Sequence, residues 1–294
     1  MKSVNMDLHM HSIMSCDGEY TPTTLMKMCK EAGMQVVAIA DHNSVEAIQE
    51  ARAQAEVLGM EYIPAIELDC HIDGVDLHIL GYGIDETKVE LLKLMEDVRK
   101  MEQGASQERI DLVKAQGIYV DEKAAYAIAP HGNVTGEIIA EIALQDKRNH
   151  EALQAYLPGG ARADNPLVNF YWDVCSQGKP AYVPINYITL QEAVDLITQA
   201  GGIAILAHPG NNTKENEELL EKIFTYDVVG LEAYSSYHTQ EQVAFYVDWA
   251  KERNLLISAG SDFHGKTKPT ISIGDTKCSD TTDLYYPLSK ALQK

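Results

Sequence analysis

The sequence predicts an α/β protein with a parallel sheet that closes, or nearly closes, into a barrel. Short apolar runs alternate with helical patterns in the first 85 residues and again after residue 190, an order typical of parallel sheets. A histidine motif, Asp-Leu-His-Met-His at residues 7–11, follows the first apolar run, and an Asp-Phe-His motif at residues 262–264 follows the last. Catalytic groups of parallel barrels lie at the carboxyl ends of the strands, so the two motifs are expected to meet at one mouth.

Capping residues mark the helix boundaries of the first segment. Thr21 and Pro22 occupy the N-cap and first positions of an expected helix that Gly33 closes. Asn43 caps a second helix, with Glu46 three residues later as in a capping box. The expected strands are residues 4–8, 35–40, 60–68 and 76–82, the expected helices are residues 22–30 and 43–59, and residues 71–74 are expected to turn.

A helical insertion interrupts the alternation. Its expected helices are residues 86–103, 106–116, 121–127, 135–145 and 166–176. Strands are then expected at residues 203–207, 228–233 and 255–259, and helices at residues 190–200, 214–225, 240–253 and 284–292. We therefore expect one barrel domain made of residues 1–85 and 179–294, and a helical insertion of residues 86–178 that caps its substrate site.

The charge of the chain limits its partners. Its 294 residues include 24 basic and 44 acidic side chains, a formal net charge of −20. Proteins that grip long nucleic acid need basic stripes to displace counterions, so long DNA or RNA is not an expected partner. A small anionic substrate is compatible with this charge, because bound divalent cations invert the local field.

Cysteine usage and hydropathy indicate the compartment. The chain has five scattered cysteines and no CxxC pair, which favours a reducing environment. No apolar stretch reaches the ~20 residues of a membrane span. We expect a cytoplasmic protein with no membrane contact.

The two terminal motifs place metal-capable side chains at alternate positions. His9 and His11 are two residues apart, as are Asp262 and His264, and alternate residues of a strand project from the same face. A lone histidine is more often a surface or satisfied core residue, but paired motifs on one barrel favour a shared metal site. Further candidates at or just beyond expected strand ends are Asp17, Asp41, His42, Glu67, His78 and His208. Together they predict a multinuclear metal centre and hence a hydrolase.

Four of these candidates differ in strength. His42 and its neighbour Asp41 end an apolar run, where an unpaired charge would be costly, so chance placement is disfavoured. The alternative for His78 is an inward-facing core histidine. The alternative for Glu67 is a solvated carboxylate on an edge strand.

At these residues the chain resembles the PHP (polymerase and histidinol phosphatase) phosphoesterases, over nearly its whole length. The resemblance rests on Asp7-Leu8-His9-Met10-His11-Ser12, Asp17-Gly18, Ala40-Asp41-His42, Glu67, His78, Ala207-His208-Pro209-Gly210 and Gly260-Ser261-Asp262-Phe263-His264. It implies a distorted (β/α)7 barrel that holds up to three Mn, Fe or Zn ions. The inserted helical subdomain is similar to that of the branch containing nucleoside 3′,5′-bisphosphate phosphatases.

The resemblance also implies roles for the site residues. One ion would take His9, His11, Glu67 and Asp262, a second Glu67 as a bridge with His78 and His208, and a third Asp17, His42 and His264. Asp41 would not bind an ion itself but would orient the side chains that do. The nucleophile would be a hydroxide bridging two ions, with Asp262 and His208 among the catalytic residues. The proton donor to the leaving alcohol is left open between Asp262 and a metal-bound water.

Substrate contacts are expected from the insertion and the loops. The resemblance points to His131, Lys179, Tyr182, His238 and Lys268, with ordinary surface polarity as the alternative for His131 and Lys268. Ala129 and Ile185 stand where relatives commonly carry arginine. The loss of one or two bidentate phosphate donors weakens the case for a nucleoside bisphosphate and leaves open a substrate with a differently placed second phosphate or a cyclic phosphodiester. Arg109, Lys123 and Arg162 are candidate replacements.

The expected activity is hydrolysis of a small phosphorylated metabolite, a nucleotide or sugar phosphate such as a nucleoside 3′,5′-bisphosphate. The alternatives are a cyclic phosphodiester and a histidinol-phosphatase-like phosphomonoesterase reaction. Hydrolysis of an amide or lactone on the same barrel is a rival. A non-catalytic metal-binding module is another, which the complete set of ligand residues disfavours.

Overall fold

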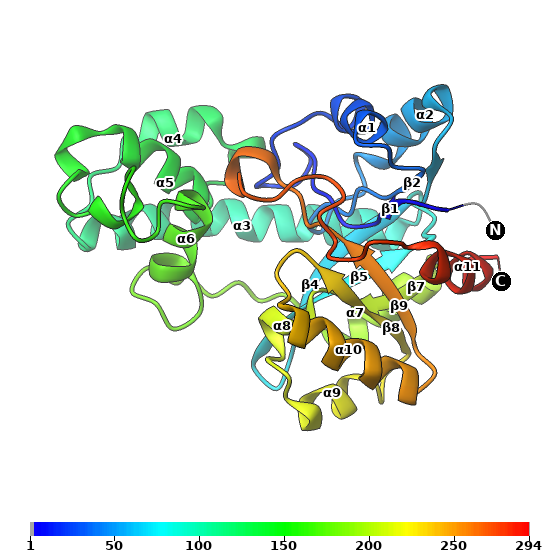
Figure 1. Ribbon diagram of the computed structural model, residues 1–294. Coiled ribbons are helices and arrows are strands. Elements are labelled where there is room, and N and C mark those ends of the chain that lie inside the picture. The colour runs from blue at the N-terminus through cyan, green and yellow to red at the C-terminus, as the bar shows by residue number, and fades with distance from the viewer. Residues whose placement is uncertain (1–2, 294) are drawn as a thin grey trace.

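The computed structural model describes residues 3–293 as a barrel-like α/β body with an all-helical arm (Figure 1). The smaller of two sheets in the body is parallel and consists of β1 (Met6–Asp7), β2 (Val36–Val37) and β3 (Glu61–Tyr62). The larger sheet has the strand order β6-β4-β5-β7-β8-β9. Its strands are β4 (Ala65–Ile72), β5 (Val75–Tyr82), β6 (Ile188–Thr189), β7 (Ile203–Leu206), β8 (Val228–Ser235) and β9 (Leu256–Gly260).

Backbone hydrogen bonds join the chain that follows β1 and β2 of the smaller sheet to β9 and β4 of the larger sheet. The Leu8 N–H donates to the Ala259 carbonyl at 3.0 Å, between the chain after β1 and β9. The Glu67 N–H donates to the Asp41 carbonyl at 3.2 Å, and the Asn43 N–H donates to the Glu67 carbonyl at 2.8 Å, between the chain after β2 and β4. One apolar cluster draws buried side chains from strands of both sheets. The strands therefore surround a common interior, and the predicted distorted barrel with a helical insertion is confirmed.

The expectation of an all-parallel sheet is wrong at β5. This strand pairs antiparallel with both β4 and β7, whereas the other pairs in the sheet are parallel. The reason is the connection between β4 and β5, which consists of Asp73 and Gly74, both with positive φ. Such two-residue turns join antiparallel strands, whereas a parallel connection needs a dozen or more residues. The expected strand at residues 60–68 is also split, because Pro64 lies between β3 and β4 and cannot donate a ladder hydrogen bond.

Helices cover the outside of the barrel (Figure 1). They are α1 (Pro22–Glu31), α2 (Ile48–Leu58), α7 (Leu190–Gln199), α8 (Pro209–Asn212), α9 (Glu217–Ile223), α10 (Gln240–Glu252) and α11 (Thr282–Ala291). Thr21 caps α1 as expected, by accepting from the Thr24 N–H at 3.2 Å. Asn43 does not cap α2, which begins later, at Ile48. Instead, Asn43 has a φ of 50°, and its side chain binds Asp69 beside the barrel mouth.

The arm is built on one long helix. α3 (Val89–Ala115) runs without interruption through Gly104, where two separate helices were expected. It is followed by α4 (Glu122–Ile128), α5 (Gly136–Gln145) and α6 (Pro166–Phe170), which continues as a π-helical turn, Tyr171–Cys175. These elements pack around an apolar cluster separate from those of the barrel. The long helix thus holds the arm beside the barrel mouth.

Among residues 3–293, no helix combines the length and apolar character required to cross a bilayer. The five cysteines are free thiols.

Candidate metal centre

Six histidines and three carboxylates from distant parts of the sequence meet at one mouth of the barrel. They lie on β4 and β5 and in the chain after β1, β2, β7 and β9. We call them the ligand cluster, and its members are His9, His11, Asp17, His42, Glu67, His78, His208, Asp262 and His264. All nine residues that the sequence suggests as metal ligands are in this cluster.

The innermost part of the ligand cluster is buried. The His9 Nε2 atom lies 3.0 Å from a Glu67 carboxylate oxygen and 3.1 Å from the His11 Nε2 atom. The His11 Nε2 atom is also 3.0 Å from the Asp262 Oδ1 atom. His9, His11 and Glu67 are fully buried, and Asp262 is 2% exposed. Water therefore cannot form hydrogen bonds with the polar atoms of these four side chains.

Protein acceptors fix which ring nitrogen faces the centre. Four Nδ1 atoms lie beside oxygens: Glu232 for His9 (3.1 Å), Ser15 for His11 (3.3 Å), Asn212 for His208 (3.1 Å) and the Asp262 carbonyl for His264 (2.8 Å). A neutral imidazole carries its single proton on one nitrogen. When Nδ1 donates to these oxygens, Nε2 presents a lone pair to the centre of the cluster. This arrangement is typical of metal-binding histidines.

An unpartnered oxygen tests whether a metal ion fits. The Asp262 Oδ1 atom is buried without a hydrogen-bond partner, although it lies 3.0 Å from the His11 Nε2 atom and 3.4 Å from the His9 Nε2 atom. With both rings protonated at Nδ1, three lone pairs face one another. A cation between them would remove the repulsion, and this mixture of imidazole nitrogen and carboxylate oxygen suits divalent Zn, Fe or Mn.

Two further groups extend the cluster toward solvent. Glu67 uses its second oxygen, Oε1, to approach the His78 Nδ1 atom at 2.9 Å and the His208 Nε2 atom at 3.1 Å. The Asp17 Oδ2 atom lies 3.0 Å from the His264 Nε2 atom and 3.9 Å from the His42 Nε2 atom. These three groups match the ligand sets that the resemblance implies. A fourth group, His42, Asp69 and His78, takes one histidine from each of the two outer groups. His11 also lies within reach of the Asp17 group.

The electrostatics keep two central carboxylates ionised. Burial works to raise the pKa of Glu67, but the nearby His9 and His42 hold this pKa well below its usual value. Burial likewise works against ionisation of Asp262, and Lys268 and His264 more than compensate, so its pKa is also well below normal. Both side chains are therefore available as ligands.

Lys268 and Tyr237 hold the outer oxygen of Asp262. The Lys268 Nζ atom donates to Asp262 Oδ2 at 2.8 Å, and the Tyr237 hydroxyl donates to the same oxygen at 2.6 Å. An ionised carboxylate with two donors on one oxygen has no proton to give. This geometry disfavours Asp262 as the proton donor, one of the two options that the sequence leaves open. Lys268 lies beside the cluster, as expected for a phosphate contact.

Asp41 supports the ligand cluster through hydrogen bonds to Ser12, the residue after His11. It is buried, and it accepts from the Ser12 backbone N–H at 2.6 Å and from the Ser12 hydroxyl at 2.7 Å. Burial raises the pKa of Asp41 to about 7. The contact holds the turn that directly follows His11. Asp41 thus lies where the sequence places a supporting residue.

The ligand and supporting residues predicted from the sequence lack three residues of this site. Glu232 is fully buried in β8 and binds the His9 ring, and Tyr237 binds Asp262. Asp69 lies 3.1 Å from the His42 Nδ1 atom. A signal for Asp69 was present, because it follows Glu67 by two positions and so shares a strand face with it. Glu232 interrupts an apolar strand, where a charge needs a buried partner.

The remaining predicted substrate residues lie elsewhere. Both ring nitrogens of His238 are occupied, Nδ1 by the Ala233 carbonyl (2.8 Å) and Nε2 by the Gly210 N–H (3.0 Å). His238 therefore has no free N–H for a phosphate, contrary to expectation, and instead holds the chain after His208. His131, Lys179 and Tyr182 have no hydrogen bond or ion pair to the ligand cluster within residues 3–293.

The candidate replacement arginines are already paired inside the arm. Arg109 donates to the Val134 carbonyl at 2.6 Å and to Glu102 at 3.2 Å. Arg162 donates to Asp173 at 2.9 Å, and Lys123 is exposed. These contacts give no support for a replacement phosphate clamp.

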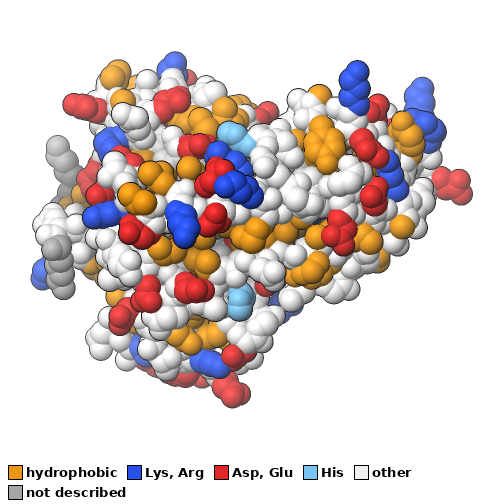
Figure 2. All heavy atoms as spheres, turned by 180° about the vertical axis from the view of Figure 1, so that it is seen from behind, with side chains coloured by type: hydrophobic (Ala, Val, Ile, Leu, Met, Phe, Trp, Pro, Cys, Tyr) orange, Lys and Arg blue, Asp and Glu red, His pale blue; other side chains and the backbone are white. Residues whose placement is uncertain are grey.

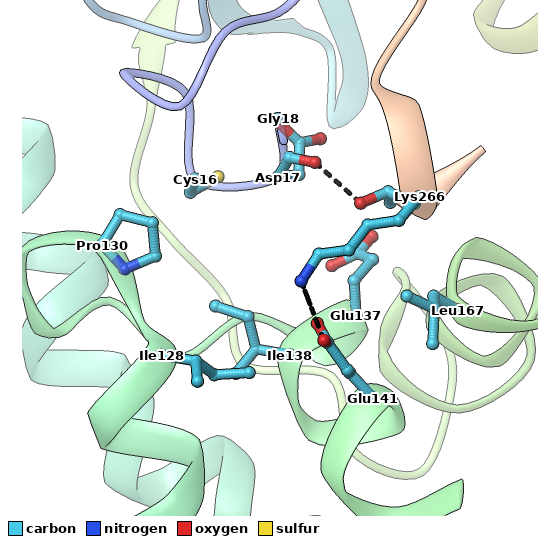
Figure 3. Close-up of a pocket in the computed structure, with 11 residues that line it drawn as sticks. Cys16, Asp17, Gly18, Ile128, Pro130, Glu137, Ile138, Glu141, Leu167 and Lys266 are labelled. Carbon is cyan, nitrogen blue, oxygen red and sulfur yellow. Dashed lines mark hydrogen bonds and ion pairs between the residues drawn. The ribbon is translucent and has the colours of Figure 1, made fainter. Parts of the chain in front are cut away.

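A small pocket adjoins the ligand cluster between barrel and arm (Figure 3). Asp17 forms part of one wall, and Glu137, Glu141 and apolar side chains of the arm form the opposite wall. The Lys266 Nζ atom bonds both Glu141 oxygens at 2.7 and 2.8 Å across this pocket. Burial, followed by the charge of Asp17, raises the pKa of Glu137 to about 7. The pocket is therefore rich in carboxyl groups and has one basic side chain, already paired.

Three relatives are similar to this chain over most of their length. A 5′-3′ exoribonuclease of Haemophilus influenzae is 31% identical over 261 residues, covering 88% of this chain and 89% of that protein. A 3′,5′-nucleoside bisphosphate phosphatase of Chromobacterium violaceum is 26% identical and covers 98% of this chain and 96% of that protein. A phosphoribosyl 1,2-cyclic phosphate 1,2-diphosphodiesterase of Eggerthella lenta is 26% identical, with 88% and 94% covered.

The chain is also similar to a solved structure and matches a protein family. An amidohydrolase from Chromobacterium violaceum, solved with bound sulfate and no metal, has a TM-score of 0.75 at 26% identity and covers 89% of this chain and 88% of that chain. The PHP domain family matches residues 7–159, the segment that contributes His9, His11, Asp17, His42, Glu67 and His78 to the cluster. The predicted resemblance is thus confirmed, and the chain belongs to the PHP domain family.

Proposed function

We propose that this metal-dependent phosphoesterase of the PHP family hydrolyses a small phosphorylated metabolite, a nucleotide or a sugar phosphate. The observation that carries the proposal is the set of ring nitrogens and carboxylate oxygens that converge around Glu67 with their lone pairs facing inward. Glu67 directs one oxygen to His9 and the other to His78 and His208. A carboxylate placed in this way can bridge two cations.

The proposed ligand sets follow the three groups of the cluster. His9, His11, Glu67 and Asp262 would hold one ion, Glu67, His78 and His208 a second, and Asp17, His42 and His264 a third. Bound Mn, Fe or Zn would lower the pKa of a water molecule to give a nucleophile and would neutralise phosphoryl charge. Lys268 lies 3.5 Å from the His264 Nε2 atom, so its ammonium group can bind a phosphate oxygen at the same mouth.

The composition of the pocket bears on which phosphate esters fit. A bisphosphate needs cationic groups for its second phosphate, whereas Glu137 and Glu141 line the pocket and Lys266 is paired. Ala129 packs against the apolar cluster of the arm. These observations favour a substrate with one phosphate, or a cyclic phosphodiester, over a nucleoside 3′,5′-bisphosphate. The Eggerthella lenta relative, named as a cyclic phosphodiesterase, supports the cyclic alternative.

A second candidate is removal of nucleotides from the end of a short RNA. It is favoured by the Haemophilus influenzae relative, which is named as a 5′-3′ exoribonuclease. The net charge of −20 opposes a long polyanion. On the face that Figure 2 shows, basic side chains are interspersed with acidic and apolar ones.

A substrate panel tests the proposed function. Purified protein loaded separately with Mn, Fe and Zn is assayed with nucleoside monophosphates, a nucleoside 3′,5′-bisphosphate, cyclic phosphodiesters, sugar phosphates, short RNA and amides. We expect phosphoester cleavage, with kcat/KM highest for single-phosphate or cyclic compounds. Amide hydrolysis without any phosphoester cleavage would overturn the proposal.

A further inference from the structure

The Asp69 carboxylate contacts two histidines of different ligand groups. Its Oδ1 atom lies 3.1 Å from the His42 Nδ1 atom and 3.3 Å from the His78 Nε2 atom. His42 belongs to the group around Asp17, whereas His78 belongs to the group around Glu67 and His208. One oxygen atom therefore faces both groups.

The nitrogens that face Asp69 are not those that face the centre of each group. The His78 Nδ1 atom is 2.9 Å from Glu67, so its Nε2 atom is the one left for Asp69. The His42 Nε2 atom faces Asp17 at 3.9 Å, and its Nδ1 atom lies closer to Asp69 than to Glu67, at 3.1 against 3.4 Å. Each ring can thus donate its N–H to Asp69 and keep a lone pair for an ion.

A reciprocal contact with Asn43 fixes the Asp69 carboxylate. The Asn43 Nδ2 atom donates to Asp69 Oδ2 at 2.6 Å, and the Asp69 backbone N–H donates to the Asn43 Oδ1 atom at 3.1 Å. Asn43 has a φ of 50°, a conformation that asparagine tolerates better than most side chains. The second oxygen of Asp69 is therefore occupied, and the carboxylate cannot easily rotate away from the two rings.

We propose that Asp69 is a positioning residue that orients His42 and His78 together and thereby couples ion binding at two of the three positions. The inference rests on the proposed function, because it assumes that the ligand cluster binds metal. Asn212 differs in this respect, because its side chain contacts one ring of the ligand cluster, that of His208. Loss of this contact should weaken one ion position only.

The test is a metal titration of the metal-free protein. Wild type and Asp69→Asn are titrated with Mn²⁺, followed by calorimetry, and bound metal is counted by elemental analysis after dialysis against a weak chelator. We expect two binding steps to weaken in Asp69→Asn, each about 10- to 100-fold, the cost typical of losing a hydrogen-bond partner of a metal ligand. The protein should then retain two fewer ions than wild type.

Matched variants separate this result from a general loss of structure. Asn212→Ala should weaken one step, and Asp73→Asn, in the exposed turn after β4, should weaken none. Metal-free Asp69→Asn should unfold at a temperature close to that of metal-free wild type. Weakening of one step would make Asp69 a direct ligand and overturn the inference, as would weakening of none. A wild-type protein that binds no metal would instead refute the proposed function.

Discussion

At the scale of single residues, the site is defined by which polar atoms are satisfied inside the protein and which are not. Protein oxygens satisfy the Nδ1 atoms of His9 and His264, whereas the Asp262 Oδ1 atom has no hydrogen-bond partner. Buried polar groups are normally paired, and an unpaired one costs about 1–3 kcal/mol. The Asp262 Oδ1 atom also lies beside the His9 and His11 Nε2 atoms, and this combination indicates where a cation would bind.

Removal of a central ligand should abolish activity without unfolding the chain. In His9→Ala we expect a lower metal content and a fall in kcat/KM of more than about 100-fold. Substitution of a residue that only hydrogen-bonds to a metal ligand already costs about 10- to 100-fold, and His9 is itself a proposed ligand. Phosphate release, elemental analysis and circular dichroism measure these effects. His150→Ala, an exposed histidine of the arm, is the control. Normal turnover in His9→Ala would contradict the assignment of the site.

Lys268 should set the acidic limit of activity. This side chain helps to hold the pKa of Asp262 well below its usual value against the opposing effect of burial. Loss of the charge in Lys268→Met raises that pKa, so protons compete with metal for Asp262 at higher pH. We expect the acidic limb of the kcat/KM profile to move to higher pH. Lys266→Met, which removes a lysine paired with Glu141, should leave the acidic limb in place.

At the scale of elements, α3 decides how the arm meets the barrel. Gly104 lies inside this helix, is exposed and has open space around its Cα atom. Glycine weakens a helix because of its conformational freedom, yet the apolar cluster of the arm keeps α3 continuous. Packing has therefore overridden a local preference.

Gly104, inside α3, and Gly117, just beyond its end, should respond in opposite directions to substitution by alanine. Gly104→Ala should raise the free energy of unfolding by about 0.5–1 kcal/mol, measured by thermal or denaturant unfolding, with unchanged kcat. Gly117→Ala should lower it, because Gly117 ends the helix with a φ of 81°, where alanine is strained. A loss of kcat in Gly104→Ala would instead identify this position as a hinge.

At the scale of the whole molecule, a strongly acidic surface surrounds a site for phosphate. The formal charge of −20 repels anions at long range, whereas bound cations would attract a single phosphate at short range. Surface repulsion acts over the Debye length, about 10 Å at 0.1 M salt. A short substrate leaves few of its negative charges near the acidic surface when it binds, whereas a long substrate leaves many.

RNA length should reveal this difference. For oligoribonucleotides of 2 to about 20 nucleotides, we expect kcat/KM to fall severalfold as the chain lengthens and to recover partly with added salt, which screens the repulsion. Dinucleotides should show a weak dependence on salt. Higher kcat/KM for longer RNA, reduced by salt, would indicate a nucleic-acid groove and favour the exoribonuclease candidate.

The sequence predicts the barrel class and places all nine members of the ligand cluster at or just beyond the ends of expected strands. Apolar runs that end in polar residues specify strands with functional ends, and the spacing of His9 and His11 places both side chains on one face. The sequence also indicated the insertion, because strand patterns are missing there. These are local properties, which neighbouring residues reveal.

The antiparallel direction of β5 follows from the Asp73-Gly74 turn, a local hairpin signal that the sequence prediction did not use. The partners of the ligand cluster, in contrast, depend on the tertiary structure. Glu232 and Tyr237 reach the cluster from a different strand and loop, and the pairing of Arg109 with Glu102 depends on how the arm packs. His238 is occupied because folding brings Gly210 to its ring. Contacts of this kind join residues far apart in the chain, so the periodicity and local spacing of the sequence carry no record of them.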